Sequence, residues 1–479
     1  MSETPENLPI FVDLDGTLIK SDVSFESFVA IIKKNPFYLF AALFWLIRGK
    51  PYLKDRISKI ISLNSQVMPY NEKFLNYLRE EKDKGRKLIL VSASNVSYVR
   101  DVSSHLGIFD DVIGTETGLN IAGQNKLDVI TEYCRQKGWR EKFAYAGNSS
   151  VDIHVWKGSA ECILVSDNRN FARKAGKELN FSEKFVLDKR LKALLRSLRP
   201  YQWSKNLLLF VPVIMGHKIF EPGYLLFTFF AFLAFSFCAS AVYIINDLFD
   251  LETDRLHRNK KFRPLASGDL QIKTALLLIP MLLILTILFS LFLPLYFTYC
   301  LLLYLVVTFS YTLRLKSAAI VDVITLSMLY VLRIFAGGMA TGIHVSQWLL
   351  SFSLFVFISL ACLKRFSELR LVDVEKDSYI HGRGYKVSDM TLISQFGTAG
   401  GYLSVFVLVF YINSKEVLAN YSNPLVLWFL CPLIVYWISR IWLLAHRAQI
   451  HEDPVVFALR DAVSYFVGIL VLLILFIAT

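Results

Sequence analysis

Cysteine is scarce and scattered in this 479-residue chain: its six cysteines form no CxxC pair and show no spacing typical of a metal site. Most are therefore expected to be small apolar residues in helices. Charged residues are also few, at 19% of the chain, whereas 54% of the residues are hydrophobic. The 38 phenylalanines exceed what the core of a soluble protein could bury, so the composition indicates a membrane protein.

A signal peptide is also missing, because residues 1–9 are polar and acidic and lead directly into an apolar strand. The N-terminal domain is therefore expected to stay in the cytoplasm. The net charge of +12 would suit nucleic acid, but the Lys and Arg residues lie mainly in loops between apolar segments. Nucleic acid is thus excluded as a partner.

The apolar residues divide the chain into two parts. Residues 1–188 have the mixed charges and short apolar runs of a soluble domain, whereas residues 189–479 alternate long apolar stretches with basic loops. The boundary is expected within 188–199. The apolar run 37–47 is too short to span a bilayer and is predicted to be a buried helix of the first domain.

Nine stretches of the second part are candidates for membrane-spanning helices, which need about 20 mostly apolar residues. If the N-terminus is inside, almost all Lys and Arg of the flanks and loops fall on the inner side, and the outer side has Lys218 and Lys415. This bias predicts a multi-pass protein of the cytoplasmic (inner) membrane. The predicted spans are 203–220, 224–247, 274–293, 295–313, 320–342, 346–363, 394–412, 424–445 and 461–479.

An acidic motif ends the second predicted span, with Asn246 followed by Asp247, Asp250 and Asp254. The spacing i, i+3, i+7 puts the three carboxylates on one helical face, where they would repel one another. A divalent cation removes that repulsion, and Mg²⁺ prefers carboxylate oxygens together with the oxygens of a phosphate ligand. The motif therefore predicts a Mg²⁺–diphosphate site, against the alternative of a solvated polar cap on a membrane helix.

The turn that follows, KKFRPLASG, supplies Lys260 and Arg263 as cations for a diphosphate. The NDxxDxxxD motif and this turn resemble the UbiA superfamily of intramembrane transferases over residues 195–479. The resemblance implies an all-α membrane domain of nine helices, with Asp247 and Asp250 as catalytic residues. It also implies that Mg²⁺–diphosphate is held by Asn246, Asp247, Asp250 and Asp254.

A second acidic motif follows the fourth helix in the aromatic prenyltransferases of that superfamily. The corresponding stretch here begins at 310–316 and keeps Asp322, but the later aspartates are missing. This departure weakens a prenyltransferase interpretation. Prenyl transfer from a diphosphate to an aromatic or other small acceptor stays open as the alternative. A lipid carrier or transporter whose acids bind a transported ion is a second one.

Four other motifs resemble, in the same order, those of polyprenyl-phosphate phosphoribosyltransferases. This resemblance implies transfer of 5-phosphoribose from phosphoribosyl diphosphate (PRPP) to a polyprenyl phosphate. The acceptor phosphate is already ionised, so the reaction needs cations that hold two anions together rather than a general base. The motifs are RPYQWSKN at 199–206, LRIFAGG at 332–338, KRFSEL at 364–369, and EDPV at 452–455 with Arg460-Asp461.

Arg333 lies within an apolar span, where an arginine usually faces a polar cavity or an anionic ligand. A structural pairing with an acid such as Asp322 is the alternative, and Lys364 and Arg365 could simply form the basic end of a helix. The candidate substrate-binding residues are Lys205, Asn246, Lys260, Arg263, Arg333, Lys364 and Arg365.

The N-terminal part begins with an apolar strand that ends in DxDGT, so that Asp13 and Asp15 point the same way. Two such carboxylates can bind Mg²⁺ while one attacks phosphorus and the other acts as acid or base. A strand ending at Ser92, then Lys126 after a turn, then an acidic turn at 147–152 follow in order.

This order resembles the haloacid-dehalogenase (HAD) superfamily of phosphohydrolases over residues 8–185. The resemblance implies an α/β Rossmann-like domain with a small helical cap near 22–70. It makes Asp13 the nucleophile, Asp15 the acid/base, and Ser92 and Lys126 phosphate binders. The implied ligands of Mg²⁺ are Asp13, Asn148 and Asp152.

Asn148 stands where the superfamily usually has an aspartate, so the site loses one charge and Mg²⁺ is expected to bind more weakly. A folded relic that only docks the membrane domain is the alternative to a working phosphatase. The sequence as a whole predicts a fused enzyme, an HAD-type phosphatase joined to a Mg²⁺-dependent membrane transferase.

Overall fold

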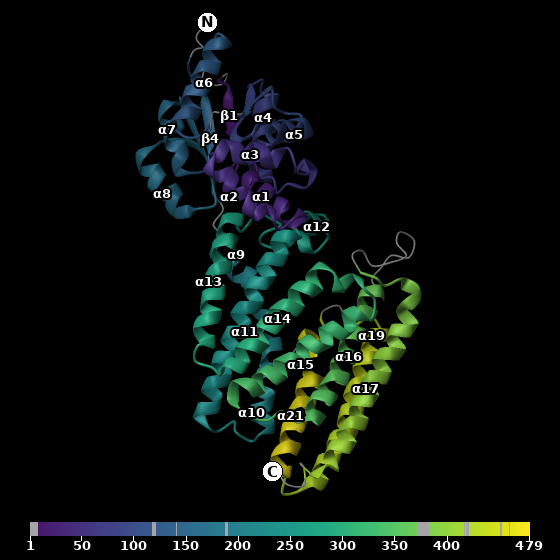
Figure 1. Cartoon of the computed structure of the whole chain (residues 1–479). Helices are drawn as coiled ribbons and strands as arrows, with labels where there is room; N and C mark the ends of the chain where they lie inside the picture. The colour runs from purple at the N-terminus through teal and green to yellow at the C-terminus, as the bar shows by residue number, and fades with distance from the viewer. Residues whose placement is uncertain are drawn as a thin grey trace. The chain divides into compact units, whose positions relative to one another are not determined.

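The computed structural model describes residues 8–116, 121–139, 141–186, 190–370, 383–415, 417, 421–450, 453–458 and 460–479 (Figure 1). The chain forms two compact units, each built from two separate stretches. The first unit contains residues 1–198 and 243–280, and the second contains 199–242 and 281–479. The predicted domain boundary between 188 and 189 lies outside the described residues and stays a prediction.

The first unit contains a six-stranded sheet in the order β3-β2-β1-β4-β5-β6, in which neighbouring strands are parallel. The central strand β1 pairs with β2 and β4, so the DxDGT motif at its end stands in the middle of the carboxyl edge. This confirms the predicted α/β domain. The strands are β1 Ile10–Asp13, β2 Leu88–Asn95, β3 Asp111–Thr115, β4 Ala144–Gly147, β5 Glu161–Ser166 and β6 Phe181–Val186.

Apolar side chains on both faces of β1, β2 and β4 are buried, as expected for a parallel sheet covered by helices. Three helices occupy the segment predicted as a small cap, α1 Val23–Lys34, α2 Tyr38–Ile47 and α3 Lys50–Ser58. The other helices of this unit's N-terminal stretch are α4 Glu72–Asp83, α5 Val96–Leu106, α6 Gln124–Gln136, α7 Ile153–Gly158, α8 Arg169–Glu178 and α9 Arg190–Leu198.

Helix α2 forms where the sequence predicted one, but the prediction that it is buried was wrong. Ala42 is its buried residue, whereas Phe40, Phe44 and Ile47 are exposed. The helix packs mainly on α1 and α3, which leaves most of its apolar surface uncovered. Hydropathy alone could not distinguish this arrangement from a core helix.

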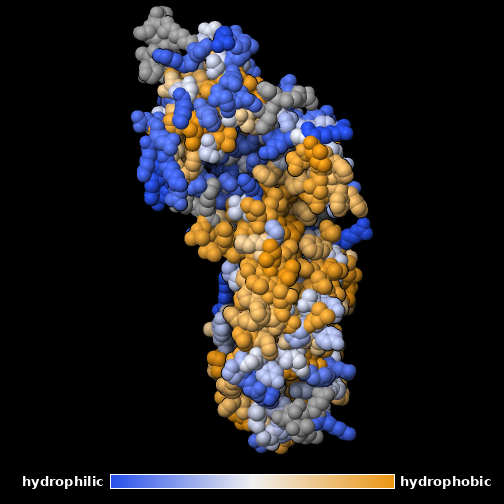
Figure 2. All heavy atoms as spheres, turned by 60° about the vertical axis from the view of Figure 1, so that its left-hand side comes forward, coloured by the Kyte–Doolittle hydropathy of each residue, from blue (hydrophilic) through white to orange (hydrophobic). Residues whose placement is uncertain are grey.

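Seven of the described helices are long and apolar enough to cross a membrane, which confirms a multi-pass membrane domain but not the nine predicted spans. Large apolar side chains such as Leu277 and Phe476 are exposed, and Figure 2 shows broad hydrophobic surface of this kind. The seven are α11 Pro222–Phe249, α13 Ile272–Ser290, α14 Leu295–Leu313, α15 Val321–Thr341, α16 Gln347–Arg370, Val387–Ile412 with α17 Met390–Ile412, and Pro424–His446 with α19 Leu430–His446.

The two predicted spans outside this set are the first and the last. The stretch 203–220 contains a 3₁₀ helix, η4 (Pro200–Phe210), and a short helix, α10 (Val211–Met215). Pro212 lies at this junction and cannot donate a backbone hydrogen bond, which helps to prevent one long α-helix. The last stretch contains the apolar helix α21 (Ala462–Ala478), which has 17 residues.

A buried ion pair joins helix α1 to the short helix α12 (Leu251–Leu256) within the first compact unit. Arg255 Nη1 and Nη2 donate to the two carboxylate oxygens of Glu26, at 3.0 and 2.6 Å. Arg255 Nε also donates to the backbone carbonyl of Ala266 at 3.2 Å. The segment that carries the acidic motif is therefore held against the N-terminal domain.

Replacing Glu26 by Gln should loosen α12, because Arg255 would stay buried without a charged partner. Breaking one side of a buried pair costs about 3 kcal/mol or more. We expect amide hydrogen exchange over 251–256 to become at least about tenfold faster, measured by mass spectrometry. The control is Glu161→Gln, which breaks the 2.7 Å pair with Arg86 in the same domain and should leave 251–256 unchanged. Unchanged exchange in Glu26→Gln would contradict the role of the ion pair.

Candidate active sites

The carboxyl edge of the sheet brings together three of the predicted site residues, Asp13, Lys126 and Asp152. Lys126 Nζ donates to Asp13 Oδ1 at 2.6 Å and lies 3.8 Å from Asp152 Oδ1. Thr17 Oγ1 donates to the other oxygen of Asp13 at 3.2 Å. Burial raises the pKa of Asp13 to about 7, although the Lys126 ammonium opposes this shift. A buried carboxylate and a buried ammonium thus face each other at the end of β1.

Asp15 is oriented by hydrogen bonds from two neighbouring elements. Its Oδ2 accepts from the hydroxyls of Ser92 and Ser94 of β2, at 2.9 and 2.7 Å. Its Oδ1 accepts from the backbone N–H of Val23, the first residue of α1, at 2.7 Å. Ser92 therefore contacts the carboxylate predicted to be the acid/base, and its own assignment as a phosphate binder stays a prediction.

Asp152 holds the acidic turn in place. Its Oδ2 accepts from the backbone N–H groups of Asn148 and Ser149, at 3.1 and 3.0 Å. Its Oδ1 accepts from the hydroxyl of Tyr145 at 2.6 Å. The side-chain amide of Asn148 packs against Gly16, whose φ of 78° also favours glycine. Both oxygens of Asp152 thus accept hydrogen bonds, as both oxygens of Asp13 do. The assignment of Asp13, Asn148 and Asp152 as ligands of Mg²⁺ stays a prediction.

Three residues at this edge were missed by the sequence analysis. Tyr145 is a buried strand residue whose hydroxyl lies 3.1 Å from Lys126 Nζ. Lys54 reaches in from the cap helix α3 and donates to the backbone carbonyl of Ala93 at 2.7 Å. Asp22 caps α1, and burial together with Asp15 raises its pKa to about 7. No local pattern pointed to Tyr145 or Lys54, because their contacts join elements that are far apart in the chain. Asp22 instead caps α1 through the nearby backbone N–H groups of Ser24 and Phe25.

The acidic motif of the membrane sequence is divided between two helices. Helix α11 ends at Phe249 and α12 begins at Leu251, with Asp250 between them at φ −99° and ψ 12°. The helix is therefore interrupted at Asp250, although the backbone N–H groups of Asp250 and Asp254 still donate to the carbonyls four residues earlier. Arg263 Nη1 nevertheless donates to Asp247 Oδ1 at 3.1 Å and to Asp254 Oδ2 at 2.6 Å, so these two acids converge on one cation.

These residues suit a hard cation such as Mg²⁺. Asp247 and Asp254 already share a positive group, and the buried Asn246 Oδ1 has no hydrogen-bond partner in the part of the chain that the structure describes. Among the described residues, no group of three His, Cys, Asp or Glu side chains is placed so that it could hold a metal ion by itself. Mg²⁺ commonly binds through one or two carboxylates, with water and phosphate oxygens completing its shell. Lys260 lies exposed in the 3₁₀ helix η5 (Lys260–Phe262).

The second compact unit brings together residues from all four phosphoribosyltransferase-like motifs. Lys205 Nζ and Lys364 Nζ both donate to Asp453 Oδ2, at 2.8 and 2.9 Å. Burial alone would raise the pKa of Asp453, but the two ammonium groups outweigh it and hold the pKa well below its usual range. Arg333 Nε donates to Asn206 Oδ1 at 3.0 Å. Arg333 also donates to the backbone carbonyl of Leu329 and to the hydroxyl of Tyr304, so its recorded partners are neutral groups. Glu452, from the fourth motif, lies outside the described residues.

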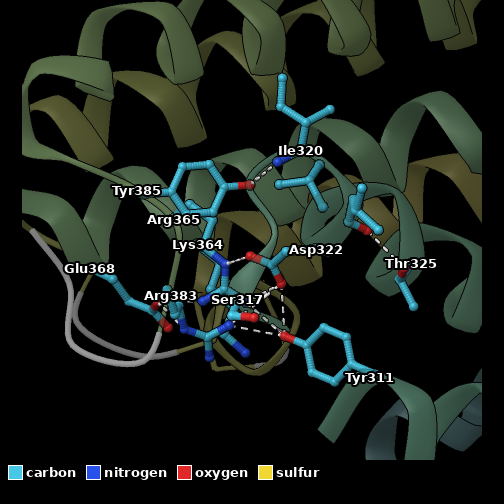
Figure 3. A network of polar contacts seen from close by, with 12 residues as sticks. Tyr311, Ser317, Ile320, Asp322, Thr325, Lys364, Arg365, Glu368, Arg383 and Tyr385 are labelled. Atoms are coloured by element: carbon cyan, nitrogen blue, oxygen red, sulfur yellow. Dashed lines mark hydrogen bonds and ion pairs between the residues drawn. The ribbon is translucent and has the colours of Figure 1, made fainter. Parts of the chain in front are cut away.

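Arg365 belongs to a separate buried network around Asp322 (Figure 3). Its Nε lies 2.5 Å from Asp322 Oδ2, and it also pairs with Glu368. Arg383 Nη1 and the hydroxyl of Tyr311 reach the other oxygen of Asp322, at 3.4 and 2.8 Å. Both Asp322 and Arg365 are fully buried. The predicted contact of Arg365 with substrate therefore stays a prediction.

Comparison with known proteins identifies both parts of the chain. Residues 208–477 match the model of the UbiA prenyltransferase family, and residues 10–157 match that of haloacid dehalogenase-like hydrolases. The chain is 38% identical over 472 residues to the uncharacterized protein y4nM of Sinorhizobium fredii, covering 97% of this chain and 90% of that protein.

Two further similarities concern the membrane domain. The chain is 34% identical over 184 residues to the decaprenyl-phosphate phosphoribosyltransferase of Mycolicibacterium smegmatis, covering 38% of this chain and 58% of that protein. A UbiA homolog from Archaeoglobus fulgidus, solved with GPP and Mg²⁺, aligns with a TM-score of 0.47 at 19% identity, covering 60% and 100% of the two chains. This chain is therefore an enzyme of the UbiA prenyltransferase family, an intramembrane transferase with an HAD-like domain at its N-terminal end.

Proposed function

We propose that the membrane domain transfers 5-phosphoribose from PRPP to a polyprenyl phosphate, and that the HAD-like domain hydrolyses a phosphate monoester. The observation that carries this proposal is that two contacts link the four motifs. Lys205 and Lys364 share Asp453, which joins the first, third and fourth motifs. Arg333 binds Asn206, which joins the second motif to the first. These motifs resemble those of polyprenyl-phosphate phosphoribosyltransferases, and the similarity to the decaprenyl-phosphate phosphoribosyltransferase of Mycolicibacterium smegmatis supports the same function. The excess of Lys and Arg in the loops of one side supports a location of the N-terminal domain on the cytoplasmic side of the inner membrane.

The transfer joins two anions, so the main task of the protein is electrostatic. Asp247 and Asp254, with Asn246 and Asp250, would hold Mg²⁺, which neutralises charge on the departing diphosphate. Arg263 and Lys260 contribute positive charge to the same group. Lys205, Arg333 and Lys364 supply cations for the phosphates, and the already ionised acceptor oxygen attacks the anomeric carbon as diphosphate leaves.

Prenyl transfer to a small acceptor is the rival function, and the network around Asp322 argues against it. Asp322 is the one acid kept from the second acidic motif of the aromatic prenyltransferases. Its carboxylate is fully buried and already neutralised by Arg365 and Arg383. A second metal would have to displace both arginines to reach it. Of the two acidic motifs, only the one at 247–254 is then left to bind a metal, which favours PRPP over an allylic diphosphate as the substrate.

Asp13 and Lys126 carry the proposed hydrolase reaction. Asp13 attacks phosphorus, Lys126 stabilises the charge of the phosphoryl group, and Asp15 protonates the departing alcohol oxygen. Water then hydrolyses the aspartyl phosphate. The 2.6 Å contact between Lys126 and Asp13 supports this assignment, because it places a cation directly at the nucleophile.

The direct test incubates the purified protein with PRPP, Mg²⁺ and a polyprenyl phosphate, and analyses the lipids by mass spectrometry. We expect a lipid-linked phosphoribose and release of diphosphate. Allylic diphosphates are tested in parallel with small aromatic acceptors. A prenylated acceptor without lipid-linked phosphoribose would refute the proposal in favour of prenyl transfer, and ion movement without turnover would favour a transporter.

Asp247→Asn should reduce the initial rate of transfer at saturating Mg²⁺ by about 100-fold or more, because one carboxylate ligand is lost from the metal site. The matched control is Glu252→Gln, an exposed acid on the neighbouring helix α12. Its rate should stay within about twofold of the wild type. Equal rates for the two variants would show that the acidic motif does not bind the metal.

Asp13→Asn should abolish phosphate release from p-nitrophenyl phosphate, because the amide cannot form the aspartyl phosphate. Lipid-linked phosphoribose should still form at the wild-type rate, since Asp13 takes no part in transfer. Phosphate is measured colorimetrically and the lipid product by mass spectrometry. If the wild type releases no phosphate either, the domain is the folded relic considered above.

A further inference from the structure

Helix α2 presents a continuous apolar face that the described protein leaves uncovered. Phe37, Phe40, Phe44 and Ile47 are 76%, 60%, 70% and 82% exposed. Their spacing of i, i+3, i+7 and i+10 puts them on one side of the helix. A patch of large aromatic side chains of this kind marks an interaction surface in a folded protein.

The patch lies close to the end of a membrane-spanning helix. Lys33, in the last turn of α1, donates to the backbone carbonyl of Phe249, the last residue of α11. Both residues belong to the first compact unit, and Lys33 is four residues before Phe37. Figure 1 shows α1, α2 and α12 at the same end of this unit. Helix α2 therefore begins a few residues after a contact with the end of α11, a helix long and apolar enough to cross a membrane.

Basic residues flank the apolar face at both ends. Lys33 and Lys34 precede the helix, and Arg48 and Lys50 follow it. The helix itself carries no charged residue, so these flanking cations are the groups that would meet anionic headgroups while the apolar helix contacts the acyl chains. With ten residues, α2 is too short to span a bilayer, so any contact with lipid would be at the membrane surface.

The same cap also reaches the phosphatase-like site. Helix α3 follows α2 after Gly49, and its Lys54 donates to the backbone carbonyl of Ala93, beside the serines that bind Asp15. One small helical cap thus carries both the apolar face and a cation at the site. A substrate phosphate borne by a lipid would meet both.

We propose that α2 is embedded in the interfacial layer of the bilayer and holds the HAD-like domain at the membrane surface, where it acts on a phosphate monoester carried by a lipid. The second half of this statement rests on the phosphatase activity proposed above. The first half depends only on the exposed face, its basic flanks and its attachment to α11.

The position of α2 is tested on the full chain in liposomes that contain anionic phospholipid. Phe44→Cys is labelled with an environment-sensitive fluorophore, which is selective because the six native cysteines are buried. The matched control is Lys177→Cys, an exposed position on α8 of the same domain. We expect brominated lipids to quench the Phe44 label at least about threefold more than the Lys177 label, and aqueous iodide to do the reverse.

Equal quenching of both labels by iodide would overturn the proposal. Protection of the Phe44 label from both quenchers would also overturn it, because the face would then be covered by protein, such as a second copy of this chain. No substrate is needed in this experiment, so its failure is distinct from failure of the proposed phosphatase.

The choice of substrate is tested with the double variant Phe40→Ser/Phe44→Ser. Its hydrolysis of lipid-linked phosphoribose in liposomes should fall at least about fivefold, while hydrolysis of the soluble p-nitrophenyl phosphate stays at the wild-type rate. Equal rates of the variant and the wild type on both substrates, or equal losses on both, would refute a role of α2 in presenting a lipid-borne phosphate.

Discussion

The buried ion pair between Glu26 and Arg255 makes the acidic segment of the membrane sequence part of the N-terminal compact unit. Arg255 directly follows Asp254 in the chain, and Glu26 lies in the first turn of α1. The same turn begins at Val23, whose backbone N–H binds Asp15. Helix α1 therefore contacts the DxD motif at one residue and the neighbour of the acidic motif at another. Helix α1 thus supports both the phosphatase-like site and the acidic motif, although hydropathy would place the domain boundary near residue 188, before the acidic motif.

Much of this architecture could be predicted because the signals are local. A strand that ends in paired aspartates, followed by Ser92, Lys126 and Asp152 after later elements, predicts a parallel sheet with these residues at one edge, and the contact between Lys126 and Asp13 agrees. Long apolar segments likewise indicate membrane helices without knowledge of their neighbours. Charge distribution between the loops adds an independent prediction of orientation.

The remaining features depend on packing between distant residues, which no local pattern reveals. Lys205 and Asp453 are separated by 248 positions, so their ion pair, which joins the first motif to the fourth, could not be read from the sequence. Asp322 was considered as a partner of Arg333, but Arg365 lies against it instead. Helix α2 has the composition of a core helix, and only its limited packing on α1 and α3 shows that it is exposed. The sequence predicted the helix correctly and its environment incorrectly for that reason.

In both sites one basic side chain lies between two aspartates. The two basic side chains differ in how far they are exposed to solvent, and therefore in how easily they can leave the aspartates. Lys126, between Asp13 and Asp152, has a side chain that is 6% exposed, whereas the side chain of Arg263, between Asp247 and Asp254, is 29% exposed. A buried ammonium is fixed by the high cost of separating it from its carboxylates. A partly solvated guanidinium can exchange partners at lower cost, because water compensates for the lost pairing. Under the proposed function, Arg263 is thus suited to leave the acids for an arriving diphosphate, whereas Lys126 is suited to stay beside Asp13.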